Sequence, residues 1–193
     1  MGSPAFSFPG ERGMPHQRDR VTLLLGLAVA VPASLAAQGS GAAAPDTTWL
    51  KWNATTKTAT FKLVAGIPGR AKSPFNFNGY TDGDLTLTVP ENSTVVLNFV
   101  NDDGTPHSAE VIDGAGPIPN MAPDQPAIPR AYTKAVSEGI AQFGTDVVRF
   151  KAAPAGSYRI FCGVPGHGLS GMWIRLEVNA AAAVPSLAEA TGR

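Results

Sequence analysis

Hydrophobic and polar residues alternate along most of the chain from Trp49 onward, as in strands with one buried face. Val95, Leu97 and Phe99, for example, share one face of an extended segment. Turn-forming residues separate such segments, and no stretch has a convincing helical period. The pattern therefore predicts an all-β fold, an antiparallel sandwich or barrel. The expected extended segments cover residues 47–52, 58–66, 75–90, 93–102, 107–113, 145–152, 156–162 and 171–179.

Proline interrupts this pattern in the middle of the chain. Five prolines lie between residues 113 and 130, which excludes a helix or a central strand there. We expect an ordered, Pro-rich excursion on the surface, centred on residues 114–130. The composition further predicts a flexible Gly/Ala leader at 38–47, one domain at 48–180 and a disordered tail at 181–193.

The first 37 residues have the features of an export segment. Arg12, Arg18 and Arg20 precede an apolar run, and Ser34 and Ala36 then form a small-x-small cleavage site. This predicts a signal peptide. An uncleaved N-terminal anchor is the alternative, although the run is slightly shorter than the ~20 apolar residues that span a bilayer. We expect a protein of the periplasm or of the outer face of the cytoplasmic membrane.

The remaining composition narrows the possible functions. The 193 residues carry no net charge at pH 7, so the chain lacks the basic face that nucleic acid binding requires. We expect a monomer that contacts a membrane only through an uncleaved N-terminus. Cys162 is the single cysteine, although exported proteins usually pair their cysteines. Its thiol must be buried and inert, joined to another molecule, catalytic or bound to a metal.

The alternation in the last two strands orients the residues around this cysteine. In residues 171–179, Met172 has the parity of the apolar positions, and the charged positions have the other parity. In the preceding strand, Cys162 has the parity opposite to Arg159 and Phe161, which we expect on the solvent side. Both sulfur-containing side chains should therefore point inward.

The loop between these strands contains a histidine at equal spacing from both sulfurs. The sequence follows the pattern C-x₄-H-x₄-M through Cys162, His167 and Met172, and the intervening glycines and proline allow a tight turn. The three side chains can therefore meet at one end of the sandwich. Zinc sites rarely use a thioether, whereas copper sites for electron transfer combine two histidines, a cysteine and a weak axial methionine.

A second histidine must come from elsewhere in the chain. His16 lies in the export segment, so His107, next to a turn and at the start of an expected strand, is the one candidate. Two histidines are too few for the further copper centres of multicopper oxidases or copper nitrite reductases. A single copper with every protein position filled has no open site for substrate, so we expect an electron carrier and not an enzyme.

The same residues are also compatible with functions that involve no electron transfer. A buried cysteine, a packed methionine and a loop histidine are each common without any metal. A Cys–His hydrolase would need a group that orients the base, and it would have no use for Met172. A structural sandwich without metal would contain these residues as packing, and a copper-binding or copper-delivery protein would use them without a redox role. The joint occurrence of the four residues favours the copper site.

Three stretches also resemble a known family: "CGVPGHGLSGMW", the "PHS" of residues 106–108, and "FNFNGYTDGDLTLTVPENSTVVLNFVN" of residues 75–101. They are similar to sulfocyanins, blue copper proteins of the cupredoxin superfamily that are related to rusticyanin. The resemblance runs from about Trp49 to Val178. It implies a cupredoxin-like antiparallel Greek-key β-sandwich with a Pro-rich insertion.

The resemblance also implies roles for individual residues. One type 1 copper ion would be bound by the imidazoles of His107 and His167, the thiolate of Cys162 and the axial thioether of Met172. Ser108 would hydrogen-bond around the cysteine sulfur, where such bonds tune the redox potential.

A small apolar patch around the exposed edge of the histidine loop is expected to receive redox partners, which in this family would be a cytochrome c or a terminal oxidase. The expected patch consists of Pro106, Val164, Pro165 and Leu169.

Overall fold

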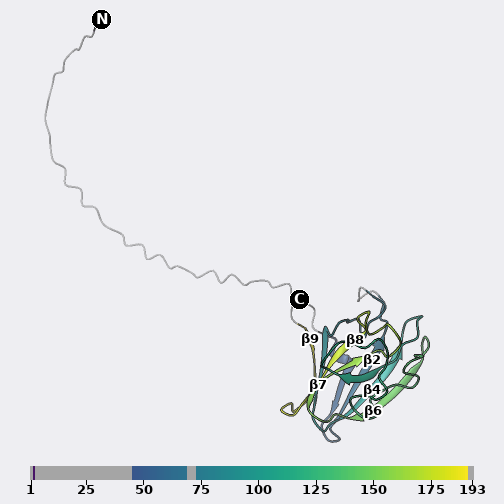
Figure 1. Ribbon diagram of the computed structural model, residues 1–193. Coiled ribbons are helices and arrows are strands. Elements are labelled where there is room, and N and C mark those ends of the chain that lie inside the picture. The colour runs from purple at the N-terminus through teal and green to yellow at the C-terminus, as the bar shows by residue number, and fades with distance from the viewer. Residues whose placement is uncertain (1, 3–44, 69–72, 191–193) are drawn as a thin grey trace, which may run out of the picture. The chain divides into compact units, whose positions relative to one another are not determined.

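Two β-sheets pack face to face in the structure, a computed structural model that describes residues 2, 45–68 and 73–190 (Figure 1). A short 3₁₀ helix, η1 (Thr47–Trp49), precedes the strands. The four-stranded sheet has the order β1 (Leu50–Asn53), β2 (Thr58–Ala65), β4 (Thr94–Asn101) and β6 (Thr145–Lys151). The five-stranded sheet has the order β5 (Glu110–Asp113), β7 (Gly156–Phe161), β8 (Trp173–Asn179), β3 (Leu85–Pro90) and β9 (Ser186–Glu189).

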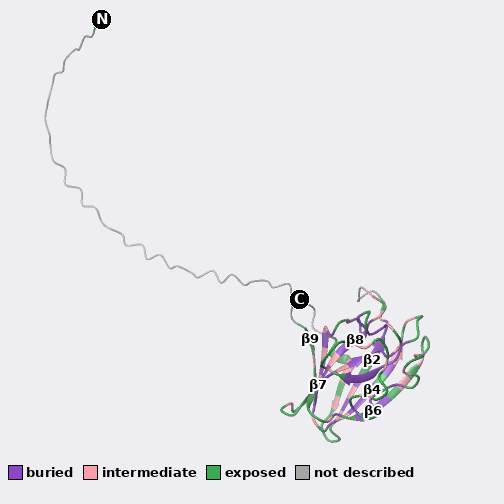
Figure 2. Cartoon of the chain, viewed as in Figure 1, coloured by how far each residue is buried: buried purple, intermediate pink, exposed green. Residues whose placement is uncertain are grey.

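The core lies between the sheets and follows the alternation of the sequence. Along β8, buried and half-buried residues alternate strictly, and along β3 they do so until its last residues (Figure 2). The core contains many fully buried, large apolar side chains, and each of these contributes about 1.5–3 kcal/mol by leaving water. They include Phe61, Leu63, Leu87, Leu97, Phe99, Phe150, Ile160, Ile174 and Leu176. The predicted all-β Greek-key sandwich is confirmed.

The sheets are mixed, which corrects the expectation of antiparallel pairing throughout. β2 pairs with β4 in parallel, and β3 pairs with β8 in parallel. Parallel neighbours require a crossover connection. Here the chain leaves β2, passes through β3 in the other sheet and returns as β4, so β2 and β4 run in the same direction.

The C-terminal segment is also more ordered than the sequence indicates. Residues 181–193 were expected to form a disordered tail, but β9 pairs antiparallel with β3 and extends the five-stranded sheet. Its residues satisfy backbone groups that an edge strand leaves unpaired. Leu187 also packs against the core. The domain therefore extends at least to Glu189.

The Pro-rich excursion runs along β5 and forms no strand of its own. The backbone N–H of Ala127 donates to the carbonyl of Val111 over 2.8 Å, and that of Thr133 donates to the carbonyl of Ala109, also over 2.8 Å. Ile128 and Ala131 are buried. The segment thus pairs with the edge of the sheet at β5 and adds Ile128 to the core, while most of its other residues stay exposed.

Phe161 differs from its expectation in burial. Phe161 was expected on the solvent side with Arg159, but it is fully buried. A Cβ added at Gly168 would lie 2.6 Å from its ring and 3.1 Å from Cγ2 of Ile118 in the excursion. Its ring therefore packs against the histidine loop at Gly168, and Ile118 of the excursion lies against the same glycine.

The predicted export segment, most of the leader and residues 191–193 lie outside the described residues. In the part of the chain that is described, no helix is both long and apolar enough to cross a membrane.

Candidate metal centre

The loop that follows β7 brings three of the predicted ligands together through its own backbone. The N–H of Cys162 donates to the carbonyl of Met172 over 3.0 Å, and the N–H of Met172 donates to the carbonyl of His167 over 3.1 Å. The N–H of His167 in turn donates to the carbonyl of Val164 over 3.1 Å. Gly171 allows the chain to turn into β8 because its φ of +94° lies in the region that favours glycine.

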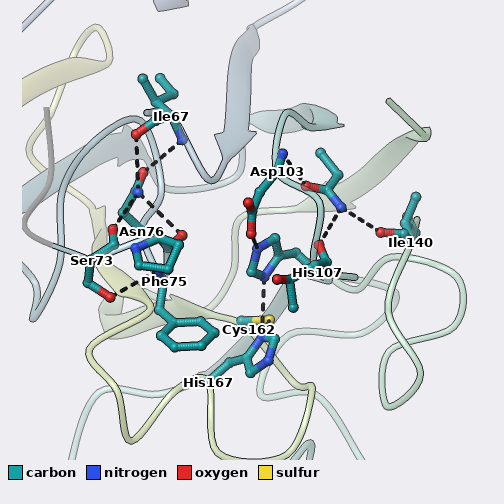
Figure 3. A network of polar contacts seen from close by, with 12 residues as sticks. Ile67, Ser73, Phe75, Asn76, Asp103, His107, Ile140, Cys162 and His167 are labelled. Atoms are coloured by element: carbon teal, nitrogen blue, oxygen red, sulfur yellow. Dashed lines mark hydrogen bonds and ion pairs between the residues drawn. The ribbon is translucent and has the colours of Figure 1, made fainter. Parts of the chain in front are cut away.

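The ring of His107 completes a compact cluster with this loop. Its Nδ1 lies 3.2 Å from Nδ1 of His167, which lies 3.5 Å from Sγ of Cys162. The three donor atoms are all within 4.8 Å of one another. In Figure 3 the rings of His107 and His167 and the sulfur of Cys162 lie close together. The structure therefore brings together three of the four predicted ligands by their side chains.

Met172, the fourth predicted ligand, is placed by its position at the start of β8. It is fully buried and belongs to the core, as its parity predicts. Its backbone hydrogen bonds to both Cys162 and His167 keep it beside the other two loop residues. Its axial role stays a prediction.

His107 lies before β5, which begins three residues later than the sequence pattern indicates. It forms a bridge with Ile140: the N–H of His107 donates to the carbonyl of Ile140 over 3.1 Å, and the reverse bond measures 2.7 Å. The position of this histidine therefore depends on a segment 33 residues further along the chain, just before β6.

Asp103 is a site residue that the sequence did not reveal. Its Oδ2 lies 3.0 Å from Nε2 of His107. A carboxylate can only accept here, so His107 carries its proton on Nε2 and presents the lone pair of Nδ1 to the cluster. The carboxylate and the cluster lie on opposite sides of the ring (Figure 3).

Ser108 contacts the sulfur as the family resemblance implies. Its backbone N–H donates to Sγ of Cys162 over 3.4 Å, and its Oγ lies 3.8 Å from the same sulfur. The hydroxyl donates to the carbonyl of Val136 over 2.6 Å and accepts from the N–H of Gly163 over 3.0 Å. Ser108 therefore links Val136, which follows the Pro-rich excursion, to the residue after Cys162.

The "FNFNG" stretch, residues 75–79, supplies an aromatic cover for the histidines. The ring centroid of Phe75 lies 4.6 Å from that of His167 and 6.3 Å from that of His107. Two buried asparagines hold this stretch by taking the place of backbone partners. Asn78 accepts from the N–H of Val64 over 3.0 Å, and Asn76 accepts from the N–H of Gly79 over 2.9 Å. The quoted stretch signalled the family, but its contact with the site was not predicted.

Burial sets the protonation of the donor groups. It lowers the pKa of His107, although Asp103 opposes this, and it lowers the pKa of His167, with a further reduction from His107. Burial also raises the pKa of Cys162, against hydrogen bonds from Ser108 and from the backbone of Val164. Neutral imidazoles are ready to bind a metal. A buried thiolate, in contrast, is stable only beside a cation.

This donor set fits copper. Two imidazole nitrogens and one thiol sulfur converge in a buried site, which matches the trigonal His₂Cys arrangement of electron-transfer copper. The carboxylate of Asp103 lies where the outer partners of metal-binding histidines are commonly found. No part of the geometry requires a hydrolytic interpretation of Cys162.

Comparison with known proteins agrees with this geometry. The family model described as "Sulfocyanin (SoxE) domain" matches residues 45–188. The chain belongs to the sulfocyanin family. A sulfocyanin from Sulfolobus acidocaldarius is 28% identical over 139 residues, which cover 66% of this chain and 67% of the relative. A crystal structure of variant rusticyanin is 24% identical, covers 64% of this chain and 78% of its own, and matches the fold with a TM-score of 0.51.

Membership of the sulfocyanin family confirms the resemblance found in the sequence. Its members are blue copper cupredoxins, which are electron carriers, so the cofactor is copper and the cluster of His107, Cys162 and His167 is suited to binding one ion. The matched range also includes most of β9, in agreement with the extended domain.

The predicted docking patch lies partly at the surface. Pro106, Pro165 and Leu169 are exposed, Leu169 by 60%, and Val164 is half-buried and packs against the core. His167 is 9% exposed, whereas His107 is fully buried. Of the two rings, His167 is therefore the one that reaches the surface, and it is flanked in sequence by three of these residues.

Proposed function

We propose that this sulfocyanin-family protein carries single electrons between redox proteins outside the cytoplasm. The donor or acceptor is a cytochrome c or a terminal oxidase, and export by the N-terminal segment brings the protein to the same compartment. His107, Cys162, His167 and Met172 bind one type 1 copper, with the methionine as the weak axial ligand.

The convergence of two imidazole nitrogens and a thiol in a buried site carries this proposal. The copper ion supplies a one-electron redox couple. The chain holds the ligands in place through the backbone bonds of the histidine loop, the bridge between His107 and Ile140, and the carboxylate of Asp103. Ligands held in this way need little rearrangement when the metal changes its charge.

The surface around His167 supports a route for the electron. A partner that docks on Pro106, Val164, Pro165 and Leu169 comes close to the edge of this ring. A small apolar patch favours weak contacts that form and separate quickly, which suits an electron shuttle.

A copper-delivery role is the alternative, and the burial of the donors argues against it. Delivery requires ligands that a recipient can reach and exchange. His107 and Cys162 are fully buried, and His167 is nine-tenths buried. Release of the ion would require the loop or the His107 segment to open.

A visible spectrum with a redox titration of the copper-loaded protein tests the proposal. We expect an intense blue absorption that disappears on reduction and returns on oxidation. Cys162→Ser should abolish the colour because the absorption depends on the copper–thiolate bond. Met172→Leu should leave a coloured site with a raised potential, because only the weak axial ligand is lost. A colourless wild-type protein would refute the carrier role, and a colourless Met172→Leu variant would contradict the weak axial role.

A further inference from the structure

A carboxylate holds the buried imidazole of the site from behind. Oδ2 of Asp103 lies 3.0 Å from Nε2 of His107, on the side of the ring opposite to Cys162 and His167 (Figure 3). His107 is fully buried, and the side chain of Asp103 is 23% exposed. A charge-assisted hydrogen bond to such a sheltered ring is stronger than a bond between neutral groups.

The position of Asp103 is itself fixed by a network that leads back to His107. The backbone N–H of Asp103 donates to Oδ1 of Asn101 over 2.9 Å. Nδ2 of this fully buried asparagine donates to the carbonyl of Ile140 over 2.8 Å. Ile140 forms the backbone bridge with His107. The acceptor and the ring therefore share one anchor and cannot shift independently.

Close packing adds a second restraint on Asp103. Gly66, just after β2, lies so near that a Cβ added to it would be 2.2 Å from Cβ of Asp103. The preceding residue, Asp102, is exposed and donates its backbone N–H to the carbonyl of Ala65 over 2.9 Å. Of these two adjacent carboxylates, Asp103 is both the one that contacts His107 and the one that packs against the end of β2.

We propose that Asp103 is a positioning residue that fixes the tautomer and orientation of His107 and, through its charge, favours the oxidised over the reduced copper ion. This inference rests on the proposed copper site. A carboxylate on the outer nitrogen raises the basicity of a metal-binding imidazole. A negative charge also stabilises a doubly charged ion more than a singly charged one. Asp103 therefore lowers the redox potential of the centre.

The tautomer can be tested without copper. Nitrogen NMR of the histidine rings in the metal-free protein should show the proton of His107 on Nε2. Asp103→Asn should keep this tautomer because the amide oxygen can still accept, whereas Asp103→Ala should lose it. A proton on Nδ1 in the wild-type protein, or no change in the alanine variant, would overturn the positioning role whether or not the protein binds copper.

The effect of the charge is tested in the copper-loaded protein. Asp103→Asn should shift the preference for oxidised over reduced copper by about tenfold, a rise in potential of about 59 mV for one electron. Asp103→Ala should in addition weaken copper binding by about 10–100-fold. The matched control is Asp102→Asn, which removes the same charge from the neighbouring exposed position and should leave the potential nearly unchanged.

The outcomes separate this inference from the function on which it rests. Equal potentials for Asp103→Asn, Asp102→Asn and the wild-type protein, all blue, would refute the effect of the Asp103 charge on the copper ion and leave the carrier role intact. A wild-type protein that never becomes blue would refute the carrier role, and the NMR measurement would still decide whether Asp103 positions His107.

Discussion

The two segments that supply the predicted ligands are built in different ways. The loop from Cys162 to Met172 carries three of them and is closed by hydrogen bonds within its own backbone. The segment from Asn101 to Glu110 carries one, His107, which is held by Ile140 from elsewhere in the chain and by the carboxylate of Asp103 in the preceding turn. The first arrangement is local, and the second exists only once the two sheets and their connections have packed.

The two segments also differ in how far their histidines are exposed to solvent. The local loop lies at the end of the sandwich, and its histidine reaches the surface with 9% of its area exposed. The segment of His107 runs beneath Phe75 and beside the stretch that precedes β6, and its ring has no exposed area. The imidazole of His167 can thus be reached from the surface, whereas that of His107 is enclosed by the protein.

Removing either histidine should have the largest effect of the changes considered, the loss of the blue copper absorption. His167→Gly and His107→Gly should both lose the blue colour because each removes one of two imidazole ligands. Added imidazole should restore the colour of His167→Gly, since the gap opens to the surface. It should not restore His107→Gly, whose gap is enclosed. Visible absorption at increasing imidazole concentration measures the difference.

Two further results would change the comparison. Equal rescue of both variants would show that the His107 segment opens as readily as the loop. Rescue of neither would mean that the exposed edge of His167 gives no entry to the site. Cys162→Ser is the control, because imidazole cannot replace a thiolate and the colour should stay absent at every concentration.

The same contrast explains which parts could be predicted from sequence. Cys162, His167 and Met172 are close in sequence on two adjacent strands, so spacing and side-chain parity were enough to bring them together. His107 was found by counting histidines. Asp103 was not found, because Asp102 and Asp103 look equivalent until the turn is packed against Gly66.

The errors in the predicted fold have the same physical origin. Phe161 alternates as expected, but it is buried against Gly168 of the histidine loop, beside Ile118 of the excursion. β9 is short, follows a run of alanines and gains its order from pairing with β3. Each depends on contact with a segment far away in the sequence, and alternation within a strand contains no information about such contacts.

Substitution of Glu110, at the end of the His107 segment, should have the next largest effect, a change in the free energy of unfolding. It is 4% exposed, and its Oε2 has no hydrogen-bond partner among the described residues. It lines a cavity of about 340 Å³ beneath the Pro-rich excursion, together with Asp124 and Tyr132 and without a basic side chain among the described lining residues. Burial raises its pKa from 4.5 to about 7.

Glu110→Gln should therefore stabilise the protein above neutral pH. The folded state disfavours the ionised carboxyl, so the penalty is absent below the ordinary pKa of 4.5, grows as the pH rises toward 7 and is constant above it. The expected gain is roughly 3 kcal/mol at about pH 8 and nearly zero at about pH 4. Urea unfolding at both pH values measures it.

The control for this prediction is Glu138→Gln, which removes a carboxylate at an exposed position and should change stability little at either pH. If Glu110→Gln gave the same small change as the control at both pH values, the carboxyl would have to be solvated through the cavity. The His107 segment would then be less tightly packed than the comparison with the loop requires.

Gly66→Ala tests the packing behind Asp103 with a smaller expected effect. Gly66 has a φ of +72°, and an added Cβ would collide with Asp103. Gly116→Ala is a close control, because its φ of +76° imposes similar backbone strain with nothing within 4 Å of the new atom. The control substitution Gly116→Ala should lower the free energy of unfolding by about 1 kcal/mol. Gly66→Ala should lower the free energy of unfolding by about 2 kcal/mol, since the collision adds the cost of overpacking.

The difference between these two variants isolates the collision, because the strain is common to both. If the His107 segment depends on distant packing, Gly66→Ala should also shift the redox potential in the direction of Asp103→Asn, whereas Gly116→Ala should not. Equal stabilities and potentials for the two alanine variants would mean that the turn of Asp103 moves away from the added Cβ without losing stability. The support of His107 would then be as local as that of His167, and the distinction between the two segments would fail.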